Sequence, residues 1–146
     1  MNFNAKGANF LEVYQTEIAP QLQNLDIILK SMDEPLTYTE ASEALYISET
    51  EIKDIMRRLS ISVIDQQSFL RIMSEASSPI CRLYQRELNI GSPYVYTRED
   101  ISYIYSIPLD IVNQACEDLG LVKLTAYTLP DLFSHVNMQP AGFDIF

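Results

Sequence analysis

Glycine and the residues of catalytic chemistry are scarce in this sequence. The four glycines stand alone at positions 7, 91, 120 and 142, so no Gly-rich phosphate-binding loop is present. His135 is the only histidine, and Cys81 and Cys116 form no CxxC pair, so a zinc site lacks ligands. No nucleophile is spaced with a base as in known catalytic motifs. We therefore expect no enzymatic activity, no metal and no cofactor.

Long uncharged apolar runs are also missing. None approaches the ~20 residues that a membrane-spanning helix needs. Residues 1–7 lack the basic stretch and apolar core of a signal peptide. Two cysteines are too few for a disulfide framework in a chain of 146 residues. These absences predict a soluble, cytoplasmic protein with two buried free thiols.

Basic residues are outnumbered: 10 lysines and arginines stand against 20 acidic residues, a net charge of -10. Phosphate contacts supply much of the affinity of nucleic-acid binding proteins, so this balance argues against strong non-specific DNA binding. The charge is uneven, because residues 37–72 carry a net -2 and residues 94–146 a net -5. A local basic patch is therefore expected only in the first of these segments, which holds Lys53, Arg57, Arg58 and Arg71.

The strongest positive signal is a segment that occurs twice, at residues 38–70 and 96–133. Each copy opens with Tyr-Thr, at Tyr38-Thr39 and at Tyr96-Thr97. A short acidic helix, an Ile-Ser or Ser-Ile turn, a second helix and a short helix with Phe beside Leu then follow. Duplication defines the unit of folding. Each copy is predicted to be a helix-turn-helix, with Thr39 and Thr97 as the N-caps of the first helices.

Capping residues and apolar spacing predict the individual helices. The first copy is expected to have helices at 40–46, at 49–59 behind a capping box of Ser48 and Glu51, and after Asp65. The second is expected to have helices at 98–105, from Pro108 to Leu119, and at 129–136. A helix at 79–89 joins the copies, and residues 121–127 form the best strand candidate because apolar and β-branched residues alternate there.

Residues 8–32 carry an apolar stripe on a long predicted helix. Its members are Leu11, Tyr14, Ile18, Leu22, Leu25, Leu29 and Met32, at alternating steps of three and four. Pro20 lies inside the pattern and predicts a kink or a fresh start near Ala19-Pro20. The stripe is either an intramolecular core face or an interface with a partner or second copy, for which Leu11, Ile18, Leu22, Leu25 and Leu29 are the candidates.

The first copy resembles the excisionase-like and MerR-like branch of helix-turn-helix proteins. The resemblance rests on the run from Tyr38 to Leu45, on Ile47-Ser48, on Ile52, Ile55 and Leu59, and on Phe69-Leu70; the second copy matches less closely. In that family the second helix lies in the major groove and a Gly-containing β-hairpin wing follows it. The link after the second helix of the first copy, residues 61–65, is too short for a wing and has no Gly. The link in the second copy, residues 121–128, is long enough for a short strand but also has no Gly.

Carried over, the resemblance implies DNA contacts by Thr50, Lys53, Arg57 and Arg58, beside Asp54. The second copy presents Asp110, Asn113, Gln114, Glu117 and Asp118 instead, and carboxylates there would repel phosphate. Two hypotheses follow. In one, the first copy binds DNA and the rest of the chain builds a homodimer; in the other, the chain is an acidic protein–protein adaptor whose second copy binds the partner, and Lys53, Arg57 and Arg58 are a solvated face.

The predicted fold is mostly α with minimal β. It has a long amphipathic helix at 1–36, a helix-turn-helix-like unit at 37–77, a connecting helix and linker at 78–93, a second, acidic unit at 94–136, and a tail at 137–146.

Overall fold

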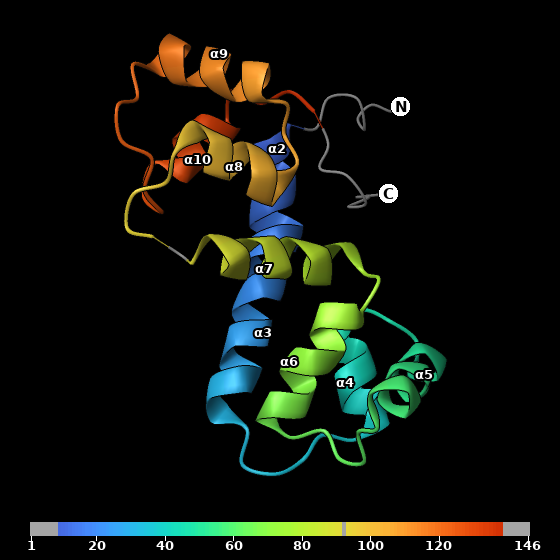
Figure 1. The fold of residues 1–146 in the computed structure, drawn as a ribbon. Helices are drawn as coiled ribbons and strands as arrows, with labels where there is room; N and C mark the ends of the chain where they lie inside the picture. The colour runs from blue at the N-terminus through green and yellow to red at the C-terminus, as the bar shows by residue number, and fades with distance from the viewer. Residues whose placement is uncertain (1–8, 92, 139–146) are drawn as a thin grey trace. The chain divides into compact units, whose positions relative to one another are not determined.

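The computed structural model of the protein describes residues 9–91 and 93–138, and these are mostly helical (Figure 1). Within them there is no strand; two isolated antiparallel bridges, Leu36–Ile64 and Tyr96–Leu124, are the only β pairing. The strand predicted at 121–127 is therefore wrong, because its alternation supports one bridge residue, Leu124, and no ladder. Most of the predicted tail, 139–146, lies outside the described residues.

The N-terminal helical stretch changes its hydrogen-bond pattern near Pro20. α2 (Phe10–Val13) passes into a π-helix, η1 (Tyr14–Ile18), and then into α3 (Ala19–Ser31). Proline has no N–H and its ring crowds the carbonyl one turn earlier, so a wider turn before Pro20 relieves that crowding. The predicted irregularity thus takes the form of a π-helix.

The chain divides into two compact units. Pro20–Gln85 forms the first-repeat unit; Met1–Ala19 and Arg86–Phe146 form the second-repeat unit. α7 (Pro79–Ile90) contributes to both units, and Pro79 starts it as predicted. Each unit has its own buried apolar side chains, so each is described by itself.

The first-repeat unit contains α4 (Tyr38–Leu45), α5 (Glu49–Leu59) and α6 (Gln66–Glu75) after α3 (Figure 1). Their inward faces bury a set of apolar side chains that are wholly inaccessible: Leu45, Ile52, Ile55, Phe69 and Ile72. Burial of each such side chain contributes roughly 1.5–3 kcal/mol relative to exposure. The apolar spacing of the sequence therefore identified the packed faces of α5 and α6.

Two capping predictions in this unit need correction. α4 begins behind Thr37, not Thr39: the Thr37 hydroxyl accepts from the Glu40 N–H, and the Glu40 carboxylate accepts from the Thr37 N–H. Ser48 does cap α5, but only half of the predicted capping box forms. The Glu51 carboxylate instead accepts from the Ser77 N–H at 2.9 Å and from the Ser77 hydroxyl at 3.0 Å.

The second-repeat unit contains α8 (Arg98–Tyr105), α9 (Leu109–Leu119) and α10 (Leu129–Phe133). α8 has the predicted bounds, and α10 ends three residues before the predicted Val136. Phe10, Tyr14, Tyr105 and Phe133 form an aromatic cluster with centroids 4.8–6.2 Å apart. Edge-to-face and tilted ring pairs add to the apolar burial of this core.

The two repeats correspond at a constant spacing of 60 positions, from Thr37 and Thr97 onward. Both threonines head capping boxes. The hydroxyls of Ser42 and Ser102 donate to the carbonyls of Ile47 and Ile107 at 2.5 and 2.6 Å. The bridges Leu36–Ile64 and Tyr96–Leu124 also keep this spacing. Positions in the first repeat, 36–76, thus correspond to positions 60 residues later in the second, 96–136, and Tyr38 corresponds to Arg98 rather than to Tyr96.

Candidate binding faces

The outer side of α5 carries the residues that the sequence indicated for DNA contact. Thr50, Lys53, Arg57 and Arg58 are all exposed, while Ile52, Ile55 and Met56 face inward. The amphipathic pattern decides this orientation, because apolar residues at steps of three and four occupy one side of the helix. The structure therefore brings the four predicted residues to the solvent-facing side of one helix.

Each cation on α5 already has a partner within the chain. The Lys53 Nζ lies 5.0 Å from the centroid of the Tyr38 ring. The Arg57 Nη1 lies 2.6 Å from the Asp54 Oδ1, and the Arg58 Nη1 lies 3.4 Å from the Glu75 Oε1. Exposed ion pairs of this kind contribute about 0–1 kcal/mol, so a stronger anion can replace them. The carboxylates nonetheless lower the positive potential of the face.

Guanidinium groups gather at the C-terminal end of α5. Arg57 and Arg58 lie in the last turn, and the Arg71 Nη2 on α6 donates to the Leu59 carbonyl at 3.2 Å. Cations stabilise the carbonyl end of a helix, where the macrodipole is negative. The three guanidiniums thus have a structural role that needs no ligand, and they form the most basic place on this unit.

The equivalent side of α9 has the opposite charge. Each outward position of α5 has an equivalent on α9 that lies 60 positions later. The outward residues of α5 are Thr50, Lys53, Asp54, Arg57 and Arg58, and their equivalents on α9 are Asp110, Asn113, Gln114, Glu117 and Asp118. The Arg98 Nη1 lies 3.2 Å from the Asn113 Oδ1 and 3.8 Å from the Glu117 Oε2. This side therefore carries three carboxylates, of which Glu117 lies near the Arg98 guanidinium. We define Asp110, Glu117 and Asp118 as the acidic face of α9.

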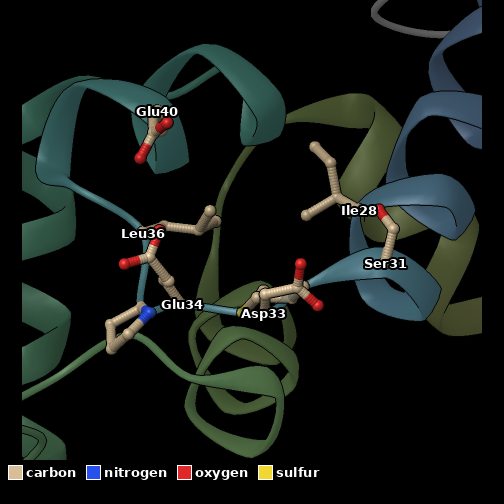
Figure 2. A pocket seen from close by; sticks show the side chains of 8 residues that line it. Ile28, Ser31, Asp33, Glu34, Leu36 and Glu40 are labelled. Carbon is tan, nitrogen blue, oxygen red and sulfur yellow. The ribbon is translucent and has the colours of Figure 1, made fainter.

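A further feature, which the sequence reasoning missed, surrounds Leu36 in the first-repeat unit. A hollow of about 270 Å³ lies between the end of α3, the loop after it and α4. Figure 2 shows its labelled residues: Ile28 and Ser31 on α3, Asp33, Glu34 and Leu36 in the loop, and Glu40 on α4. A second hollow of about 270 Å³ adds Asn24, Glu43 and Ala44 and shares three residues with the first: Ile28, Leu36 and Glu40.

A third hollow of about 310 Å³ lies on the other side of Leu36. It includes Tyr38 and Met56 together with Val63 and Ile64 of the link after α5. Near these hollows the sequence has Asp33 and Glu34 before Pro35, a pattern that favours a turn and does not predict a cavity. Their existence depends on how α3 and the link pack against α4, which no local pattern encodes.

The N-terminal stripe divides between core and surface. Ile18 and Leu25 are wholly buried, whereas Leu11, Leu22 and Leu29 are partly exposed. Buried side chains of a single chain are not available to a second copy. The core-face hypothesis therefore accounts for Ile18 and Leu25, while the interface hypothesis retains only the other three residues.

The clustering and burial of the acidic and cysteine side chains bear on metal binding and on thiol reactivity. Within 9–91 and 93–138, no cluster of three or more His, Cys, Asp or Glu residues has the geometry to hold a metal ion. Both cysteines are buried free thiols, and burial raises the pKa of the Cys81 thiol to about 11. A neutral buried thiol is a poor nucleophile. None of the helices in this part of the chain combines the length and apolarity needed to cross a membrane.

Comparison with known proteins adds no further constraint. No protein-family model, curated protein or solved structure matches the chain. The features that bear on function are therefore those of the molecule itself: the outer side of α5, the acidic face of α9 and the hollows around Leu36.

Proposed function

We propose that the chain is a non-enzymatic adaptor that binds a protein partner through the acidic face of α9. One observation carries this proposal. The two repeats share the capping box of their first helix and the buried positions of their second helix, yet Lys53, Arg57 and Arg58 are replaced by Asn113, Glu117 and Asp118. The backbone scaffold is kept while the charge of one exposed side is inverted, so the two repeats suit different binding chemistry.

The acidic face of α9 suits a basic protein surface. Asp110, Glu117 and Asp118 are exposed, and Arg98 is the cation that lies beside them. Such a face repels phosphate, and it accelerates and orients the approach of a lysine- or arginine-rich patch. Because rim charges act mainly on association rate and register, the binding should weaken as salt rises.

A specific observation also favours a second candidate, DNA contact through α5. Arg57, Arg58 and Arg71 gather at one end of this helix, and Lys53 shares a face with Arg57. In the manner of helix-turn-helix proteins, α5 would enter the major groove with Thr50 reaching base or phosphate. The net charge of -10 and the pairing of Arg57 with Asp54 weigh against this candidate.

A salt series with mixed-sequence duplex DNA separates the two candidates. We expect no binding by fluorescence anisotropy even at the lowest salt, where phosphate contacts are strongest. The matched variant carries Arg57→Glu and Arg58→Glu. If the unmodified chain binds DNA and the double variant does not, the preference for a protein partner is overturned. The DNA-binding helix is then α5.

A basic peptide without apolar residues, made of alternating lysine and glycine, tests the acidic face of α9. Glu117→Lys with Asp118→Lys should weaken its binding about tenfold, because attraction becomes repulsion. The control is Glu99→Lys with Asp131→Lys, which makes the same charge change elsewhere in the second-repeat unit. Equal loss in both double variants would show that only net charge matters and would contradict a localised site.

A further inference from the structure

We propose that the groove between α3 and α4 docks a basic amphipathic helix of a partner protein. The groove is formed by the two hollows that share Ile28, Leu36 and Glu40. Three residues line both hollows, so the hollows adjoin one another beside α4. The whole groove lies in the first-repeat unit, and its residues are distinct from the acidic face of α9.

The second hollow, in the part of the groove that includes Ala44, has an apolar floor. Ile28 from α3 and Leu36 from the loop are only partly buried, and Ala44 lies on the inner side of α4. Figure 2 shows Ile28 and Leu36 on opposite sides of the space below Glu40. A partner's apolar side chain that excludes water from these partly exposed aliphatic side chains lowers the free energy of the complex.

The rim of the groove is acidic and is not neutralised within the described residues. Asp33, Glu34 and Glu43 are exposed, and among the described residues their carboxylates have no hydrogen-bond or ion-pair partner. Glu40 uses its Oε1 to accept from the Thr37 N–H at 2.9 Å. No lysine or arginine lines either hollow. Charge complementarity therefore selects a cationic occupant for this apolar floor.

The length of the groove along α3 and α4 favours a helix as the occupant. Asn24 and Ile28 are one turn apart on α3, and Glu40 and Ala44 are one turn apart on α4. The lining therefore extends over a full helical turn on both walls. An amphipathic helix fills such a space with one stripe of apolar side chains and places its flanking lysines or arginines against the rim.

The segment at 139–146 does not have this chemistry. It contains Phe143, Ile145 and Phe146 but also Asp144, and it has no lysine or arginine. An acidic rim would repel its carboxylate rather than attract the segment. A separate partner with a basic stripe fits the groove better.

Binding of two synthetic helical peptides tests the proposal. One peptide has a leucine stripe flanked by lysines, and the other has the same composition in scrambled order. Ile28→Gln should weaken binding of the striped peptide about tenfold, because a polar group then faces the buried stripe. Ile27→Gln, at the adjacent and more exposed position of α3, should leave the affinity within about twofold.

The rim has its own matched pair of variants. Glu43→Lys should weaken the striped peptide about fivefold and reduce the salt dependence of binding, whereas Glu99→Lys on α8 should do neither. Circular dichroism and thermal unfolding confirm that each variant is folded. Selective loss in Ile28→Gln and Glu43→Lys supports the groove.

Several outcomes would overturn it. These are equal binding of the striped and scrambled peptides, equal loss in Ile28→Gln and Ile27→Gln, or no binding of either peptide. Light scattering that shows a dimer broken by Ile28→Gln would assign the groove to a second copy instead. Because these variants do not alter α9, failure here leaves the adaptor proposal standing, and failure of the α9 test leaves the groove standing.

Discussion

Thr37 begins the first short helix because its side chain and that of Glu40 satisfy each other's backbone N–H groups. Thr39 lies two residues too late for this role, and its hydroxyl donates to the Glu49 Oε2 at 2.8 Å instead. The Thr-x-x-Glu pattern of a capping box was present in the sequence. Tyr38-Thr39 matches Tyr96-Thr97 in residue type, and aligning these two pairs predicts Thr39 as the cap. That alignment is wrong by two residues, because Thr37 is the equivalent of Thr97.

At the residue scale, this correction gives a stability prediction. Thr37→Ala should lower the free energy of unfolding by about 1 kcal/mol, since it leaves an N–H of α4 without its acceptor. Thr97→Ala, at the equivalent position, should cost the same. Thr39→Ala should cost less than half as much, because it removes only an exposed side-chain hydrogen bond. Urea unfolding curves measure all three, and a larger loss for Thr39→Ala would contradict the assigned cap.

At the scale of the element, the ends of α5 and α9 use one geometry with different residues. Ser60 follows α5 with φ 57° and Gly120 follows α9 with φ 65°, both in the left-handed region. Glycine adopts this region without steric cost, whereas a residue with a Cβ pays about 1 kcal/mol or more. Glycine commonly follows the last residue of a helix, so Gly120 is a recognisable helix end, but nothing in Ser60 itself indicates a positive φ.

Exchanging these two residues should change stability in opposite directions. Ser60→Gly should raise the free energy of unfolding and Gly120→Ser should lower it, each by about 1 kcal/mol. A Cβ at Gly120 meets no atom within 4 Å, so the cost there is backbone strain alone. Gly120→Ala, the control for the hydroxyl, should match Gly120→Ser. A destabilising Ser60→Gly would show that the Ser60 side chain contributes more than its strained backbone costs.

At the scale of the whole molecule, each compact unit contains one buried thiol: Cys81 in the first-repeat unit and Cys116 in the second-repeat unit. Burial is the main cause of the raised pKa of Cys81, with the charge of Glu51 adding to it and the hydroxyl of Ser78 opposing it. Near neutral pH the folded thiol is therefore protonated as well as inaccessible. Reaction with a thiol reagent thus requires opening of the surrounding unit.

Thiol labelling can therefore report on each unit separately. Phe69→Ala, in α6, should accelerate labelling of Cys81 far more than that of Cys116, because Phe→Ala in a core costs about 3–5 kcal/mol locally. Phe133→Ala, in α10, should have the opposite selectivity. Mass spectrometry of labelled peptides distinguishes the two cysteines. Equal acceleration at both thiols in both variants would show that the chain opens as one cooperative body.

The sequence predicted more of the fold than of the binding surfaces. The bounds of α5 and α8 and the start of α7 at Pro79 follow from capping residues and from apolar spacing, which act within one or two turns. The same spacing predicts that Val112, Ala115 and Cys116 of α9 are buried, but it also places Leu109 inward, and Leu109 is exposed. Other contacts join residues on different helices. Arg58 pairs with Glu75, and Arg71 donates a hydrogen bond to the Leu59 carbonyl. No local pattern contains that information.

By itself, the sequence determined that the chain is helical, that it is built from one duplicated arrangement and that the two copies differ in charge. These properties depend on residue type and on spacing along the chain, so they are readable without coordinates. Only the tertiary structure decided that Arg58 pairs with Glu75, that Arg71 donates to the Leu59 carbonyl and where the groove around Leu36 opens. Those features arise from packing between distant segments, where shape and distance, rather than local preference, set the free energy.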